Sequence, residues 1–239
     1  MPEASLYKRV VLKLSGEAMA GSSGYGFDAE AIDALALQVE QVYALGIQVS
    51  VLIGGGNLWR GTSGSRRLDI DRVSADYMGM LGTAMNGLAF RAALERLAIP
   101  VRVQSAIDMK PIAETYVHRR AMRHLEKGRI VLFVAGTGSP YFSSDTTAAL
   151  RAAEIGADLI IKATQVDGVY TADPRQDSSA KRFPKISYEE YLQRGLTVLD
   201  MTAVALCRDN RIPIIVLSLA DPANMKRALL GEDVGTVIG

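Results

Sequence analysis

The segment from Ile160 to Arg175, IIKATQVDGVYTADPR, places four side chains that can do chemistry directly after an apolar run. They are Lys162, Thr164, Asp167 and Asp173. Asp-Gly and Asp-Pro are turn signals, so both aspartates are expected on rigid backbone at the end of a strand. Open α/β sheets bind their ligands at the carboxyl ends of the strands. The segment therefore indicates a binding site, although an ordinary hairpin or strand-to-helix loop explains it equally well when it is taken alone.

Three glycine-rich turns elsewhere in the chain each follow a predicted strand. They are KLSG with Lys13, Ser15 and Gly16, IGGGNLWRG with Gly54, Gly55, Gly56 and Arg60, and AGTGSPYFSSD with Gly136, Gly138 and Asp145. A glycine has no Cβ, so its backbone N–H can approach an anion closely, and the N-terminus of a following helix adds partial positive charge. One such turn would also suit close packing of a helix on a strand. Three of them, with Lys13 and Arg60 nearby, favour a phosphate site.

The usual nucleotide-binding motifs are nevertheless missing from this sequence. There is no G-x-x-x-x-G-K-[ST] motif, which excludes a P-loop enzyme. The triple glycine continues into Asn57, Leu58 and Trp59 and so fails the dinucleotide pattern. The match to G-x-G-x-x-A between Gly24 and Ala29 begins ten residues after the first predicted strand and carries little weight.

Composition narrows the class of protein. The chain has 239 residues, with 49% hydrophobic and 22% charged, which is typical of a globular enzyme or binding protein. A net charge of +1 gives no electrostatic footprint for nucleic acid. Acidic residues interrupt the one basic cluster, Arg66, Arg67 and Arg72, so we interpret it as a solvated loop. The sequence shows no membrane-length apolar stretch and no secretory signal pattern, which predicts a cytoplasmic protein.

The single cysteine and the two histidines are not predicted to do chemistry. Cys207 lies in an apolar-spaced run and is predicted to be a buried structural thiol. His118 and His124 lie on a polar predicted helix without a partner at a metal-ligand spacing, so both are predicted to be surface residues. The sequence therefore predicts neither a metal centre nor a histidine base.

Short apolar runs alternate with helical patterns along the whole chain. The predicted strands are Arg9 to Leu14, Gln48 to Ile53, Val101 to Gln104, Ile130 to Ala135, Leu159 to Lys162 and Pro213 to Leu217, with a short last strand within Val234 to Ile238. The predicted helices are Asp28 to Ala44, Val73 to Leu97, Ile112 to Leu125, Ser144 to Glu154, Ser187 to Arg194, Thr202 to Asn210 and Asp221 to Leu230. Most strands lack strict alternation, as do strands buried on both faces. We predict an α/β fold, a three-layer α/β/α sandwich with a mainly parallel central sheet, and one domain over residues 1–239 because no linker divides the chain.

The strand-end lysine, the triple glycine and the DGVYTADP turn together resemble the amino acid kinase fold family, and within it the chain is similar to the bacterial UMP kinases. The resemblance covers nearly the whole chain through KLSGEA, IGGGNLWRG, RVSADYMGMLGTAMNGLA, AGTGSPYFSSDTTAALRAAE, KATQVDGVYTADP and RDNRIPIIVLS. KLSG and DGVYTADP are shared widely, whereas ADYMGMLGTAMNGLA and GTGSPYFSSDT are specific to the UMP-phosphorylating branch. The resemblance implies phosphoryl transfer from ATP to UMP with Mg²⁺, by a homohexamer that GTP activates and UTP inhibits.

The resemblance also implies roles for individual residues. The ATP-binding set is Lys13, Leu14, Ser15, Gly16, Gly56, Arg60, Thr164, Tyr170 and Asp173. The UMP-binding set is Gly55, Asp76, Thr137, Gly138, Ser139, Pro140, Tyr141, Phe142, Ser143 and Ser144. The departures are mild, with Trp59 and Tyr170 where other aromatic residues are common and Ser143 and Ser144 where threonines can stand.

Physical reasoning agrees with these roles. The catalytic set is Lys13, Arg60, Asp145 and Lys162. The two lysines would neutralise the transferring phosphoryl group, and Asp145 would orient them. The Asp76 carboxylate can accept hydrogen bonds from two ribose hydroxyls, although it could also be an ordinary aspartate on a helix surface. Lys162 could likewise be an ordinary surface lysine. Effector sensitivity is assigned to a glycine-rich surface loop, made of Gly21, Ser22, Ser23, Gly24, Tyr25, Gly26 and Phe27.

Two other functions remain open at this point. A kinase that phosphorylates acetylglutamate, glutamate or carbamate would share KLSG and DGVYTADP but would not need Asp76 to bind a ribose. A non-catalytic nucleotide or oxyanion sensor on the same fold would need affinity without transition-state charge. Retention of Lys13, Arg60, Asp145 and Lys162 together argues against the sensor.

Overall fold

The computed structural model describes residues 5–60, 68–172, 174, 177 and 179–239. The elements along the described chain are β1 (Arg9–Leu14), the short 3-10 helices η1 (Gly16–Met19) and η2 (Gly21–Ser23), α1 (Ala29–Tyr43), β2 (Gln48–Ile53), α3 (Arg72–Arg96), β3 (Val101–Ser105), β4 (Glu114–Thr115), α4 (His118–Glu126), β5 (Ile130–Val134), α5 (Ser144–Ile155), β6 (Leu159–Thr164), β7 (Val169–Tyr170), β8 (Arg182–Phe183), β9 (Lys185–Ile186), α6 (Tyr188–Gln193), α7 (Met201–Asn210), β10 (Ile214–Ser218), α8 (Asn224–Leu229) and β11 (Thr236–Ile238).

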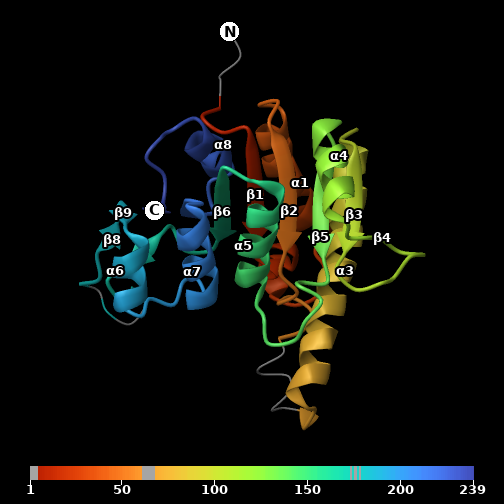
Figure 1. The fold of residues 1–239 in the computed structure, drawn as a ribbon, viewed down its shortest axis with the longest axis horizontal. Coiled ribbons are helices and arrows are strands. Elements are labelled where there is room, and N and C mark those ends of the chain that lie inside the picture. Colours follow the sequence, from red (N-terminus) through yellow and green to blue (C-terminus); the bar gives the residue numbers. More distant parts are fainter. Residues whose placement is uncertain (1–4, 61–67, 173, 175–176, 178) are drawn as a thin grey trace.

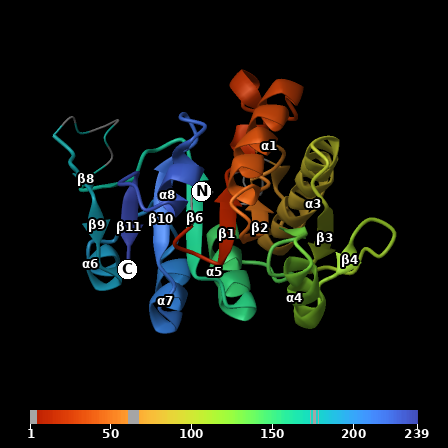
Figure 2. The same cartoon turned by 90° about the horizontal axis from the view of Figure 1, so that it is seen from above.

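A nine-stranded sheet in the order β4-β3-β5-β2-β1-β6-β10-β11-β9 runs through the middle of the described molecule. The neighbours from β4 to β10 pair in parallel, β11 runs antiparallel to β10, and β9 is parallel to β11. Figure 2 shows α1, α3 and α8 on one face of the sheet and α4, α5, α6 and α7 on the other. Each face has its own hydrophobic core. The predicted three-layer α/β/α sandwich with a mainly parallel sheet is therefore confirmed.

The local sequence explains why these elements form where they do. Strand β1, RVVLKL, has five buried positions of six, as expected for a strand covered on both faces. Asp28 caps α1 by accepting from the backbone N–H of Ala31 at 2.8 Å. Ser143 caps α5 by accepting from the backbone N–H groups of Asp145 and Thr146, each at 3.1 Å. The Ser143 cap fixes the start of the helix that directly follows the third predicted phosphate turn.

The predicted helix from Ile112 to Leu125 is wrong in its first half. Helix α4 begins only at His118, and residues Glu114–Thr115 pair with β3 as the edge strand β4. Tyr116 continues this pairing, because its backbone N–H donates to the Ser105 carbonyl at 2.8 Å. Pairing with a strand ten residues earlier is a tertiary effect, and a helical pattern of apolar residues does not reveal it.

One of the two histidine predictions is also wrong. His118 is exposed as expected, but His124 is buried. Its Nε2 lies 3.0 Å from a Glu114 carboxylate oxygen and its Nδ1 lies 3.0 Å from the Arg129 guanidinium. Both ring nitrogens are therefore engaged in a structural network. Cys207 is buried as predicted, and burial raises the pKa of its thiol to about 12.

The N-terminal half of α3 projects beyond the carboxyl ends of the strands (Figure 1). Every helix within the described ranges is too short or too polar to cross a membrane.

Candidate active site

Two buried lysines lie side by side at the carboxyl ends of the central strands. Lys13 of β1 and Lys162 of β6 are register partners on neighbouring parallel strands, and both side chains are almost fully buried. Asp145, in the first turn of α5, contacts both of them. One of its carboxylate oxygens lies 3.0 Å from Lys13 Nζ and the other lies 2.6 Å from Lys162 Nζ. The sheet and one helix N-terminus thus build a group of two ammonium ions and one carboxylate, which we call the lysine–aspartate cluster.

The electrostatics of this cluster favour an anion. Burial by itself would raise the pKa of Asp145, but the charges of Lys13 and Lys162 outweigh it and hold that pKa below its ordinary value. Burial lowers the pKa of Lys162, and the charge of Lys13 lowers it further, whereas Asp145 raises it. With both lysines protonated, the three groups of the cluster sum to one positive charge, and Asp200 is a further carboxylate whose charge acts on Lys162. Because an unpaired buried charge is costly, the cluster is suited to a negatively charged ligand such as a phosphoryl group.

The glycine turns approach one another too closely for any other residue. A Cβ on Gly16 would lie 2.1 Å from the Gly54 carbonyl oxygen, and a Cβ on Gly55 would lie 2.7 Å from the Gly79 carbonyl oxygen of α3. These are backbone contacts, so a rotamer change cannot relieve them. Close backbone packing therefore explains Gly16 of KLSG and Gly55, the middle residue of the triple glycine.

A pair of buried asparagines fixes the triple-glycine turn. Asn86 of α3 donates through Nδ2 to the Gly54 carbonyl and to Asn57 Oδ1, each at 2.7 Å. Asn57 donates through Nδ2 to Asn86 Oδ1 at 3.0 Å and to the Gly26 carbonyl at 2.8 Å. The turn is thereby tied to α3 and to the end of the loop Gly21 to Phe27. Nothing in the sequence pattern marked Asn86.

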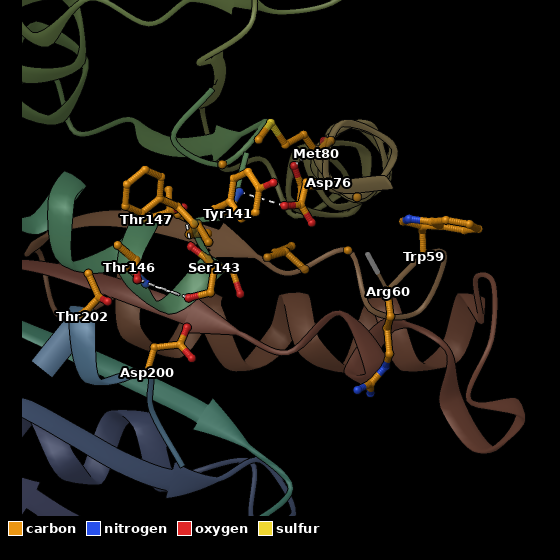
Figure 3. Close-up of a pocket in the computed structure, with 18 of the residues that line it drawn as sticks. Trp59, Arg60, Asp76, Met80, Tyr141, Ser143, Thr146, Thr147, Asp200 and Thr202 are labelled. Atoms are coloured by element: carbon orange, nitrogen blue, oxygen red, sulfur yellow. Dashed lines mark hydrogen bonds between the residues drawn. The ribbon is translucent and has the colours of Figure 1, made fainter. Parts of the chain in front are cut away.

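A cleft of about 610 Å³ opens beside the lysine–aspartate cluster, between α3 and the N-terminus of α5 (Figure 3). The predicted UMP-binding residues that line it are Gly55, Asp76, Tyr141, Phe142, Ser143 and Ser144. The others, Thr137, Gly138, Ser139 and Pro140, are not among its lining residues. The Thr137 hydroxyl instead donates to the Ser139 carbonyl at 3.0 Å and accepts from the Ser139 backbone N–H at 3.1 Å. The cleft thus brings together only part of the predicted set.

Asp76 is the acidic side chain of α3 that faces this cleft (Figure 3). Arg72 Nε lies 2.8 Å from each of its carboxylate oxygens, and the backbone N–H of Tyr141 donates to it at 2.8 Å. The Arg72 guanidinium lies 5.2 Å from the centre of the Tyr141 ring. Asp76 therefore connects α3 to the loop before α5, and the surface-aspartate alternative does not describe it.

Arg72 corrects the interpretation of the basic cluster as a solvated loop. It is the first residue of α3 and lines the cleft, whereas Arg66 and Arg67 lie outside the described residues. The i,i+4 spacing of Arg72 and Asp76 was the available signal, because residues four apart meet on one face of a helix. Arg60 also lines the cleft, and its guanidinium pairs with Glu17 of η1.

A second cleft, of about 390 Å³, has Val198 among its lining residues, and the Val198 carbonyl accepts from Lys162. Tyr170, Gly168, Leu196, Thr197 and Val198 are among its lining residues. The Tyr170 hydroxyl donates to the Asp167 carboxylate at 2.8 Å. Thr164, from the same predicted set, is not among the lining residues, and Asp173 lies outside the described residues.

The segment from Thr197 to Thr202 separates the two clefts. Thr197 and Val198 line the smaller one, and Asp200, Met201 and Thr202 line the larger one. Lys162 Nζ donates to the Val198 carbonyl at 2.5 Å, so the cluster touches this segment at its middle. Asp200 precedes α7 but makes no capping hydrogen bond with its side chain, which faces the larger cleft. The lysine–aspartate cluster therefore contacts, through Lys162 and Val198, the segment whose residues line both clefts.

A model of the amino acid kinase family matches residues 8–218. The chain belongs to the amino acid kinase family. Three solved structures are similar to it over nearly the whole chain. UMP kinase from Bacillus anthracis is 40% identical with a TM-score of 0.94, covering 98% of this chain and 96% of that one. UMP kinase from Ureaplasma parvum is 36% identical with a TM-score of 0.91, covering 97% and 98%. Uridylate kinase from Archaeoglobus fulgidus is 32% identical with a TM-score of 0.75, covering 96% and 99%.

Membership of the amino acid kinase family confirms the resemblance read from the KLSG, triple-glycine and DGVYTADP segments. It does not by itself assign a role to any residue. Asp200 was absent from the predicted site, and none of the motifs singled out in the sequence contains it. The burial of Lys162 excludes the surface-lysine alternative, and its role in the site stays a prediction.

Proposed function

We propose that this member of the amino acid kinase family is a UMP kinase, which is a nucleoside monophosphate kinase. It would act in the cytoplasm, in the biosynthesis of the pyrimidine nucleotides CTP and UTP. Residues 1–239 would form a single domain. The enzyme transfers the γ-phosphoryl group of Mg-ATP to UMP and forms UDP and ADP. The observation that carries the proposal is the lysine–aspartate cluster, whose neighbours Ser144 and Thr146 line the larger cleft and whose Lys162 donates to Val198 of the smaller one. The similarity of the whole chain to UMP kinases and a uridylate kinase, at 32% to 40% identity, supports UMP as the acceptor.

The larger cleft receives UMP, and the smaller cleft, beside Tyr170, receives the adenosine of ATP. Of the predicted ATP set, Lys13, Leu14, Ser15, Gly16, Gly56 and Arg60 stand near the phosphates, whereas Thr164 and Asp173 are retained as adenosine contacts on the resemblance alone. Among the UMP set, Ser143 and Ser144 offer hydroxyls at the N-terminus of α5, which suits the α-phosphate. Thr137 to Pro140 remain proposed contacts that would need the loop to close on the nucleotide.

The chemistry needs charge neutralisation and no protein base. An oxygen of the UMP phosphate attacks the γ-phosphorus in line, and the bond from that phosphorus to the oxygen bridging it to the β-phosphorus breaks, leaving ADP. The acceptor phosphate is already ionised, so no side chain has to remove a proton from it. Lys13 and Lys162 stabilise the charge on the transferring group, and Asp145 holds the two ammonium ions at a fixed spacing.

Mg²⁺ would enter with ATP, held mainly by the phosphate oxygens, and would neutralise part of the phosphate charge. The described residues contain no group of three His, Cys, Asp or Glu side chains that could hold a metal ion. The exposed Asp200 carboxylate lies in the larger cleft beside the cluster, where oxygen donors are compatible with such a complex.

A homohexamer with GTP activation and UTP inhibition is also proposed, on the strength of the resemblance. An apolar row on α3 supports assembly, because Val73, Tyr77, Met78, Leu81 and Met85 are each between 37% and 53% exposed. The loop Gly21 to Phe27 stays the proposed effector segment. Its Gly26 exchanges hydrogen bonds with Asn57, which connects the loop to the triple-glycine turn.

The acceptor is tested with Mg-ATP and a panel of UMP, CMP, dUMP, glutamate and carbamate, following ADP release. We expect kcat/KM to be highest for UMP. We expect no ADP release with glutamate or carbamate. Preference for glutamate or carbamate would support the carboxylate or carbamate kinase instead. Binding of ATP and UMP without ADP release from any acceptor would support the non-catalytic sensor.

Asp76→Asn is expected to raise KM for UMP about tenfold and to leave KM for ATP nearly unchanged, because a charge-assisted hydrogen bond to the ribose is worth roughly 1.5 to 3 kcal/mol. Initial rates at varied UMP and varied ATP measure both constants. Asp71→Asn is the matched control on the same helix, since its side chain only caps α3 through Ser74. A similar loss for both substrates, or an equal effect of Asp71→Asn, would indicate a fault in α3 and contradict the ribose assignment.

A further inference from the structure

Tyr191 of α6 holds the segment between the two clefts from behind. Its side chain is completely buried, and its hydroxyl makes two hydrogen bonds to a single residue, Leu199. It accepts from the Leu199 backbone N–H at 2.6 Å and donates to the Leu199 carbonyl at 3.0 Å. One phenol therefore satisfies both polar backbone groups of a buried residue.

Each of these hydrogen bonds controls a peptide plane that reaches the active site. The Leu199 N–H belongs to the same rigid peptide unit as the Val198 carbonyl, which accepts from Lys162. The Leu199 carbonyl belongs to the same unit as the backbone N–H of Asp200, whose carboxylate faces the larger cleft. Because the peptide unit is planar, fixing one of its polar groups fixes the direction of the other. The phenol thus sets the direction of the carbonyl that holds the Lys162 ammonium.

We propose that Tyr191 is a positioning residue for phosphoryl transfer, one that aims the Val198 carbonyl at Lys162 and places Asp200 in the larger cleft. The proposal rests on the proposed function of the lysine–aspartate cluster. The Tyr191 hydroxyl stays protonated through the neutral pH range, because burial raises its pKa to about 12. It therefore keeps the proton that it donates to the Leu199 carbonyl.

Helix α6 supplies a matched control in Tyr188. This tyrosine is also buried, and its hydroxyl donates to a backbone carbonyl at 2.6 Å. That carbonyl belongs to Ile212, which lines neither of the two clefts. Removal of either hydroxyl leaves buried backbone groups without a partner, so both variants should lose some stability. Only the change at Tyr191 acts on the segment that touches Lys162.

The kinetic test compares Tyr191→Phe with Tyr188→Phe, each with its Tm measured so that assays are run well below unfolding. For Tyr191→Phe we expect kcat to fall about 5- to 10-fold while KM for UMP and for ATP stays within about twofold. For Tyr188→Phe we expect kcat to stay within about twofold of the wild type. An equal loss of kcat in the two variants, or no loss in Tyr191→Phe, would overturn the proposal.

A second readout does not depend on the identity of the acceptor. The ammonium of Lys162 faces Lys13, Asp145 and Asp200, and the Val198 carbonyl is its neutral acceptor. A misdirected carbonyl stabilises the ammonium less, so Lys162 should titrate at lower pH in Tyr191→Phe than in the wild type. NMR of ¹³C-labelled lysine side chains measures this titration, with the Lys162 signal assigned by its loss in Lys162→Met.

The two readouts separate failure of this proposal from failure of the proposed function. A wild-type protein that releases no ADP with UMP would refute the proposed function, while a lowered Lys162 titration in Tyr191→Phe would still support the positioning of Lys162. An unchanged titration in Tyr191→Phe would overturn the role of Tyr191 even if the wild type were an active UMP kinase.

Discussion

Lys13→Met is expected to lower kcat about 100-fold or more, with a smaller effect on KM for either substrate. The Lys13 ammonium is buried beside Lys162 and shares Asp145 with it. It therefore acts where charge develops on the transferring group, and its loss removes roughly 3 kcal/mol of transition-state stabilisation. Steady-state rates at saturating ATP and UMP measure the effect.

The variant should fold, because methionine matches the aliphatic stem of lysine and a balanced Asp145–Lys162 pair remains. Lys8→Met is the control near the start of the same strand, where the lysine is exposed. It should leave kcat unchanged. A near-normal kcat in Lys13→Met would remove Lys13 from the chemistry and leave Lys162 as the only candidate of the pair.

Asp145→Asn is expected to be comparably damaging to kcat and more damaging to stability. Among the described residues, Asp145 is the carboxylate that forms ion pairs with both buried lysines, and the substitution removes its charge. Loss of one partner from a buried ion pair typically costs about 3 to 5 kcal/mol in the free energy of unfolding. The double variant Lys13→Met/Asp145→Asn relieves the repulsion and should be more stable than Asp145→Asn alone. Purely additive losses in urea unfolding would contradict this coupling.

The pH dependence of stability carries a definite sign. The folded-state pKa of Asp145 is depressed, so its contribution is present above the unfolded-state value of about 3.9 and is lost as the pH falls through the folded value. The stability gap between the wild type and Asp145→Asn should therefore be wide at pH 7 and should shrink in acid. A gap that does not change with pH would mean that the carboxylate is not held ionised by the lysines.

The proximity of the residues in the lysine–aspartate cluster could be predicted from the sequence, because the carboxyl ends of parallel strands meet at one edge of a sheet. Lys13 and Lys162 each stand near the end of an apolar run, and parallel pairing in register brings them together. Asp145 follows a serine cap at a helix start, a local signal that places it at the same edge. The fold class followed from similarly local patterns.

The residues that sequence reasoning missed depend on contacts that a local pattern does not contain. Glu114 joins an edge strand and engages His124, so a predicted helix and a predicted surface histidine both failed there. Asp200 belonged to none of the predicted motifs, and its place in the larger cleft depends on the packing of α7 against α5. Tyr191 fits an ordinary core position until its hydroxyl is seen to hold both backbone groups of Leu199.

The central claim is direct transfer of a phosphoryl group between ligands in two clefts that meet at the lysine–aspartate cluster. A single-turnover experiment with excess enzyme, ATP labelled at the γ-phosphate, Mg²⁺ and UMP tests it most directly. We predict that the label passes into the β-phosphate of UDP at a rate at least equal to kcat, with no labelled protein at any time. Label that appears first on the protein, or that leaves as inorganic phosphate while UMP is unchanged, would contradict direct transfer at this cluster.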